Sequence, residues 1–310
     1  MENTRAKTTR NSLILLLTAT IWGMAFVSQS KGMDYMHPFT FNGVRSLIGA
    51  AGILVYILIS RKIAGDKAAK LDWKLNVRAG LLCGIFLTIA STLQQFGIKY
   101  TSVGKAGFIT TLYIIFVPMF GVFLKKKVAP VVWAAAGMAA VGMYLLCMTE
   151  SLRLGAGDIM VFLCAIAFAI QIMTVDHYAA RIDGAVVSCI QFTVCGVVCC
   201  IGALIWGQPT FGQLQEGLGA LLYAGVLSCG VGYTLQIVGQ KGLNPTVAAL
   251  IMSLESVIAT ISGWIAYKIG FLSTDQTLTP RQIAGCVIVF AAVILVQLPP
   301  EWFRFGKKND

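Results

Sequence analysis

Two segments of the chain align with one another without a gap: GIKYTSVGKAGFITTLYIIFVPMFG (97–121) and GQKGLNPTVAALIMSLESVIATISG (239–263). Each segment begins and ends with glycine, and each is mostly apolar. Similar offsets relate the first apolar run of the chain to the sixth, and the fifth to the tenth. Because self-similarity within a chain is the signature of a repeated architecture, the sequence predicts two related halves, residues 1–150 and 151–310.

The composition places both halves in a lipid bilayer. Of the 310 residues, 57% are hydrophobic and 12% are charged, and the mean hydropathy is +0.79. The apolar runs have the length of about 20 residues that crosses a bilayer core as a helix. We therefore predict an all-α integral membrane protein with ten transmembrane helices, near residues 11–31, 38–60, 78–98, 103–124, 129–148, 157–176, 184–206, 216–239, 245–267 and 281–298.

Five spans in each half determine how the halves are related in space. A repeat with an odd number of spans enters the membrane upside down in its second copy, which gives an inverted pair of halves. We therefore expect an inverted five-plus-five repeat. Two equivalent halves of opposite orientation suit alternating access, in which one site near the middle of the membrane opens first to one side and then to the other.

The basic residues predict the orientation of the chain. Most of the 24 lysines and arginines fall on one side of the predicted spans: at both termini, between residues 61 and 78, and at Lys125 to Lys127. Cytoplasmic loops retain positive charge, so we predict a multi-pass protein of the cytoplasmic membrane with both termini in the cytoplasm. The basic residues behind the net charge of +11 lie at span ends, where they fit anionic lipid headgroups. They do not indicate a nucleic-acid partner.

The motifs of common enzymes and metal sites do not occur in the sequence. The nine cysteines lie in apolar runs without a C-x-x-C pair, and the two histidines, His37 and His177, are far apart. Neither a P-loop nor a G-x-S-x-G or H-E-x-x-H motif is found. The sequence therefore predicts no metal, no cofactor and no enzymatic activity, with a membrane enzyme acting on a lipid as an alternative.

Four strings, taken in chain order, resemble the EamA-type branch of the drug/metabolite transporter superfamily: TATIWGMAF (18–26), PFTFNGVRSLIGA (38–50), GKAGFITTLYIIFVPMFG (104–121) and SLESVIATISGW (253–264). The resemblance covers nearly the whole chain. It implies the drug/metabolite transporter fold, with spans one, three, four, six, eight and nine around a central cavity and spans five and ten at the periphery. It also implies export of amino acids or related metabolites.

Two charged residues inside the predicted spans are candidates for the work of transport. An ionisable group deep in a span costs about 2.5–3.5 kcal/mol on insertion scales, so it should face a cavity, a partner or water. Glu255 lies near the middle of the ninth span, where desolvation favours the neutral form of a carboxyl group, and it could exchange protons or bind a substrate ammonium group. Arg45 in the second span could hold a substrate carboxylate, pair with an internal acid or extend to the interface.

Other residues on the predicted cavity spans are candidates for its lining. Neutral amides can bind polar groups or hold helices together, and aromatic rings can stack on a substrate or simply pack. These candidates are Trp22, Phe26, Gln95, Tyr113, Phe116, Gln171 and Gln236. Pro118 lies inside the fourth span, where the loss of a backbone hydrogen bond predicts a hinge.

The function that these features predict is secondary-active transport of a small metabolite, such as an amino acid, outward across the cytoplasmic membrane by alternating access. Proton coupling would follow from Glu255. The alternatives are an uptake or exchange carrier for another metabolite or cofactor, a channel, and the membrane enzyme named above. The small-residue run AAAGMAAVG (134–142) predicts either packing within the chain or a homodimer contact.

Overall fold

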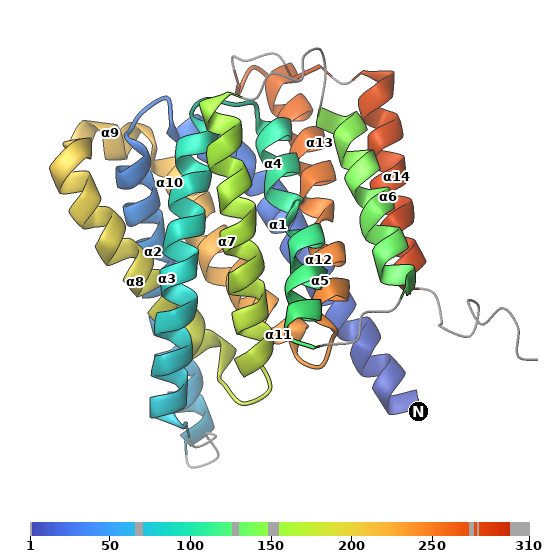
Figure 1. Cartoon of the computed structure of the whole chain (residues 1–310). Helices are drawn as coiled ribbons and strands as arrows, with labels where there is room; N and C mark the ends of the chain where they lie inside the picture. Colours follow the sequence, from blue (N-terminus) through green and yellow to red (C-terminus); the bar gives the residue numbers. More distant parts are fainter. Residues whose placement is uncertain are drawn as a thin grey trace, which may run out of the picture.

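The computed structural model describes residues 2–65, 71–125, 130–147, 155–272, 276–277 and 279–297, and every regular element in these ranges is helical (Figure 1). The first half contains α1 (Glu2–Gly32), α2 (Pro38–Ala64), α3 (Trp73–Ile98), α4 (Val103–Thr111), α5 (Tyr113–Phe123) and α6 (Pro130–Cys147). The second half contains α7 (Ala156–Tyr178), α8 (Gly184–Gly202), η2 (Ala203–Gly207), α9 (Phe211–Glu216), α10 (Leu218–Leu222), η3 (Tyr223–Gly232), α11 (Tyr233–Gln240), α12 (Pro245–Met252), α13 (Leu254–Lys268) and α14 (Pro280–Gln297).

The expected all-α membrane fold is confirmed. Eight helical stretches of the described chain are long and apolar enough to span a membrane: Lys7–Gly32, Pro38–Ala64, Trp73–Ile98, Val103–Phe123, Ala156–Tyr178, Gly184–Gly207, Leu218–Gln240 and Pro245–Lys268. Shorter apolar stretches in α6 and α14 stand at the predicted fifth and tenth spans. We call the end of the bundle that carries the N-terminus the N-terminal face, and the opposite end the far face (Figure 1).

Proline and a polar cap begin several spans, which explains why their starts could be predicted. Pro38 opens α2 after His37, and Pro245 opens α12 after Asn244, whose side chain accepts from the Thr246 backbone N–H at 2.9 Å. Proline suits the first helical turn because that turn has no partner for its N–H. These local signals end one span and begin the next.

The fourth and ninth spans are each interrupted at equivalent positions of the repeat. The fourth span breaks at Leu112, between α4 and α5, and the ninth at Ser253, between α12 and α13. Thr111 and Ser253 align in the repeat, and each hydroxyl donates to the carbonyl three residues earlier, at 2.9 and 2.7 Å. Such bonds compete with the helical pattern. The interruption therefore lies before Pro118, which is buried inside α5.

The peripheral position expected for the fifth and tenth spans agrees with the structure. α6 and α14 pack along one another at one side of the bundle (Figure 1). A Cβ atom on Gly142 would lie 2.9 Å from the Gly285 carbonyl oxygen, so the close approach of the two helices requires glycine there. The run 134–142 thus supplies a contact within the chain, and a homodimer stays a prediction.

Candidate functional site

A small cavity lies at the centre of the bundle, between spans of both halves. Its free volume is about 30 Å³, which is room for one or two water molecules. The walls include α2 and α8 in addition to the spans that the family resemblance implies. Because a metabolite is larger than this space, helices must move apart before one can enter.

The polar wall of the cavity carries an acidic and a basic side chain as well as amides. Charged and amide side chains on this wall are Gln29, Arg45, Gln94, Gln236 and Glu255. The sequence did not indicate Gln29, and it indicated Gln94 only as an amide that could either bind polar groups or join helices, because nothing local distinguishes the two roles. Half of the remaining lining residues are aromatic, namely Trp22, Phe26, Tyr113, Phe168, Phe192 and Tyr233.

Three of the candidate residues lie outside this wall. Gln95 is fully buried and its Nε2 donates to the Gln29 backbone carbonyl at 3.2 Å. Phe116 packs edge-on against Phe162 of α7, with ring centroids 5.6 Å apart. Gln171 is fully buried, and it contacts Gln236 but not the cavity, with its Nε2 3.5 Å from Gln236 Oε1. The other six candidates, Trp22, Phe26, Arg45, Tyr113, Gln236 and Glu255, line it.

Glu255 and Tyr113 form a buried hydrogen bond at the centre of the molecule. The Tyr113 hydroxyl donates to Glu255 Oε1 at 3.0 Å, and the two residues are 2% and 4% exposed. They also occupy equivalent positions in the repeat alignment. The midpoint of two points related by a twofold axis lies on that axis, so the predicted axis between the inverted halves would pass between Tyr113 and Glu255. Each residue follows the interruption of its own span.

Arg45 projects into the cavity from α2 with little to bind its charge. The side chain is 5% exposed, its Nε donates to Asn42 Oδ1 at 3.0 Å, and its guanidinium lies 5.5 Å from the centre of the Phe41 ring. Within the described ranges of the chain, no carboxylate lies within ion-pair distance of Arg45. Its terminal nitrogens are therefore available to an anionic group in the cavity.

The eighth span is irregular where it borders the cavity. Residues Tyr223–Gly232 form a π-helical segment, η3, and such segments occur frequently at functional sites. The Trp22 indole N–H donates to the Ser228 carbonyl of this segment at 3.4 Å. A Cβ atom on Gly232 would lie 2.6 Å from Trp22 Nε1, so glycine is required for the indole to reach this position.

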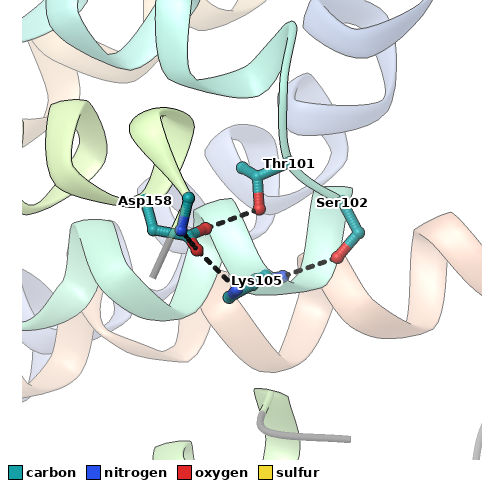
Figure 2. A network of polar contacts seen from close by, with 5 residues as sticks. Thr101, Ser102, Lys105 and Asp158 are labelled. Carbon is teal, nitrogen blue, oxygen red and sulfur yellow. Dashed lines mark hydrogen bonds and ion pairs between the residues drawn. The ribbon is translucent and has the colours of Figure 1, made fainter. Parts of the chain in front are cut away.

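A partly buried ion pair joins α4 to α7 near the start of both helices, at the far face (Figure 2). Lys105 Nζ of α4 lies 2.5 Å from Asp158 Oδ2 of α7, and Asp158 is only 4% exposed. The same carboxylate accepts from the Thr101 hydroxyl and from the Gly155 backbone N–H, each at 2.9 Å. This ion pair, the far-face latch, joins a helix of the first half to a helix of the second.

The N-terminal face is closed by hydrogen bonds to backbone carbonyls. Asn11 Nδ2 of α1 donates to the Lys241 carbonyl at 2.7 Å, and Lys241 Nζ donates to the Ile182 carbonyl at 3.2 Å. These contacts, the N-terminal-face closure, join α1 to the turn after α11, and that turn to the one before α8. The helices are thus joined differently at the two faces, by an ion pair at the far face and by bonds to backbone carbonyls at the N-terminal face.

Known proteins match this chain over most of its length. The EamA-like transporter family matches residues 10–148 and again residues 155–298. An uncharacterized transporter of Archaeoglobus fulgidus is 28% identical over 290 residues, which are 92% of this chain and 84% of that protein. The uncharacterized transporter YwfM of Bacillus subtilis is 24% identical and covers 94% of both chains.

A solved structure supports the fold independently of close sequence similarity. One crystal structure superposes with a TM-score of 0.73 at 16% identity, over 96% of this chain and 99% of the other. That likeness concerns the fold alone, whereas the sequence match extends over both halves. The chain belongs to the EamA-like transporter family.

Proposed function

We propose that this protein is a secondary transporter of the cytoplasmic membrane that exports a small zwitterionic metabolite, such as an amino acid, by alternating access. The observation that carries the proposal is the presence of one acidic and one basic side chain in the same cavity. Glu255 and Arg45 both line it, yet Glu255 bonds to Tyr113 and Arg45 to Asn42 instead of to each other. Such an arrangement suits a ligand with one group of each sign.

Each end of a zwitterion has a complementary group in the cavity. The Arg45 guanidinium can bind a carboxylate with two parallel hydrogen bonds, and Glu255 can bind an ammonium group. Trp22 and Tyr233, whose ring centroids are 4.5 Å apart, offer an aromatic wall to an apolar side chain. The two halves differ at these positions, since Arg45 aligns with Gln191 and Glu255 with Tyr113. An asymmetric pair of positions fits a substrate with two unlike ends.

Proton coupling follows from competition at Glu255. A carboxylate that binds an ammonium group cannot at the same time hold a proton, so the two occupants exclude one another. Release of the substrate outside and protonation of the empty site would then drive the return step. The position of Glu255 beside the predicted axis between the inverted halves supports this role, because a site at the axis is equally near to both faces as they open in turn.

The orientation within the membrane is part of the proposal. The N-terminal face carries Arg61, Lys62, Lys125 and Arg181 near the span ends, and positive charge is retained in the cytoplasm. The far-face latch then closes the external side, and the N-terminal-face closure shuts the cytoplasmic side. The match of one family to residues 10–148 and 155–298 supports the two-repeat organisation.

Reconstitution in liposomes tests the proposal. Radiolabelled amino acids, amines and organic acids are screened for saturable counterflow, and then for flux driven by a pH gradient. We expect zwitterions to outcompete the amines and acids of the same size. We expect Glu255→Gln to retain counterflow with a weaker affinity for the zwitterion, because the ammonium group loses its carboxylate, and to lose the response to the pH gradient. Gln215→Glu on the exposed surface of α9 is the control. Saturable transport of a non-zwitterion alone, or pH-driven flux that survives in Glu255→Gln, would contradict it.

A further inference from the structure

Five buried polar side chains lie between the central cavity and the N-terminal face, and the cavity itself does not account for them. Gln171 of α7, Ser188 and Gln191 of α8, and Gln236 and Gln240 of α11 are each at most 1% exposed. We call this set the amide file. Only Gln236 also borders the cavity. Buried polar groups of this kind normally have hydrogen-bond partners, so their bonding indicates what the file does.

Hydrogen bonds connect the part of the amide file that lies near the cavity. Gln236 Nε2 donates to Gln171 Oε1 at 3.3 Å, and Gln171 Nε2 lies 3.5 Å from Gln236 Oε1 and from Gln191 Oε1. These amides join α7, α8 and α11, and a role as helix glue would explain them.

Helix glue does not explain the rest of the amide file. The Gln191 Nε2, the Ser188 hydroxyl, and both polar atoms of the Gln240 amide are buried without a hydrogen-bond partner. Leaving such atoms unpaired costs free energy, and a water molecule or a polar solute removes that cost. Four unpaired atoms on two facing helices therefore indicate a place that is wet or occupied during part of the working cycle.

The direction of the amide file follows from the helices that carry it. Ser188 lies about one turn before Gln191 on α8, and Gln240 about one turn after Gln236 on α11. Both steps lead toward the N-terminal face. There the ammonium group of Lys241, directly after α11, donates to the carbonyl of Ile182, shortly before α8. The file therefore begins at the cavity and ends at the N-terminal-face closure.

We propose that the amide file is the cytoplasmic half of the solute path and a polar binding site on it, which opens when the Lys241 contacts break while the far-face latch is closed. Amides donate and accept hydrogen bonds without carrying charge, so the file suits a hydrated polar or zwitterionic solute. On opening, the glutamines exchange their bonds to one another for bonds to that solute. The direction assigned here rests on the orientation given under the proposed function.

Cysteine accessibility tests this path without a known substrate. Ser188→Cys and Gln240→Cys are made singly in the full-length protein, which retains its own cysteines, and are treated in sealed vesicles with the membrane-impermeant thiol reagent MTSET from one side at a time. Peptide mass spectrometry reads each thiol separately. The matched control is Val197→Cys, on the lipid-facing side of the same helix α8 and 48% exposed. Size-exclusion profiles confirm that each variant is folded.

We expect both file cysteines to react at least tenfold faster from the cytoplasmic side than from outside, and Val197→Cys to react from neither side. Adding Asp158→Asn, which weakens the far-face latch, is expected to slow the cytoplasmic reaction several-fold, because the protein then spends less time open to the cytoplasm. Reaction no faster than that of Val197→Cys, faster reaction from outside, or no slowing by Asp158→Asn would overturn the proposal. Failure of amino-acid transport would not affect these labelling rates, so the two proposals fail separately.

Discussion

The far-face latch offers a prediction whose size can be worked out from the structure. In Lys105→Met, Asp158 keeps the Thr101 and Gly155 donors at 2.9 Å but loses its cation at 2.5 Å. Removing one partner of a fully buried pair costs about 3–5 kcal/mol, whereas an exposed pair contributes about 0–1 kcal/mol. Asp158 is buried and the Lys105 side chain is 21% exposed, so a value of about 1–3 kcal/mol applies, as for a hydrogen bond to a charged group.

The free-energy cost of removing the ion pair applies only to the conformation in which the far face is closed. The latch joins α4 to α7 while the far face is closed, so its removal shifts the equilibrium toward the state that is open at that face. A free energy of about 1–3 kcal/mol corresponds to a shift of about 5–150-fold. A cysteine at Gln29, on the cavity wall, reports the opening, because the Gln95 amide bonds to the backbone carbonyl of residue 29 and not to its side chain.

The assay measures how fast MTSET reacts with Gln29→Cys from the far-face side of sealed vesicles. We expect the rate to rise about 5–150-fold on adding Lys105→Met. Lys31→Met is the matched control, because it removes the exposed ion pair with Asp34 at 3.0 Å and should leave the rate unchanged. The double variant Lys105→Met/Asp158→Asn should gain less than the sum of the single effects. An unchanged rate in Lys105→Met, or an equal rise in Lys31→Met, would refute the role of the latch.

Three further predictions concern packing, the cavity and pH. Gly232→Ala should lower the free energy of unfolding by about 1–3 kcal/mol because its Cβ would meet Trp22 Nε1 at 2.6 Å, whereas Gly137→Ala, with nothing within 4 Å, should be neutral or stabilising by thermal unfolding. Arg45→Met should weaken the binding of carboxylate-bearing solutes by about tenfold or more and leave amines unaffected, as measured by competition in counterflow. Burial and, to a smaller extent, the positive charge of Lys99 lower the pKa of His37 below 6.5, and the neutral Nδ1 of His37 accepts a backbone N–H at the start of α2. The contribution of His37 to the free energy of unfolding should therefore be constant above pH 6.5 and fall at lower pH. His37→Gln should remove that fall.

Much of this protein could be predicted from its sequence, because membrane insertion depends on local properties. Apolar length gives the spans, proline and polar caps give their starts, and a gapless self-alignment gives the repeat. The composition also restricts the ionisable residues inside spans to a few, so Glu255 and Arg45 stood out from the chain alone. The π-helical η3 and the unpaired amides of the file carry no such local signal, since glycines and glutamines serve many purposes in membrane helices.

The tertiary structure decided which of these residues meet. Tyr113 and Glu255 are 142 residues apart, and their contact depends on how two interrupted spans are rotated against one another. In a helix, a shift of one residue turns a side chain by about 100°, which is why Gln95 falls outside the cavity while its neighbour Gln94 lines it. The ion pair of Lys105 with Asp158 likewise joins residues that are 53 positions apart in the chain. Hydrophobic length and pattern in the sequence by itself determined an all-α membrane fold, because insertion depends on local properties, and the family resemblance added the transporter. Only long-range packing decided which side chains line the cavity and which contacts join the helices at its two faces.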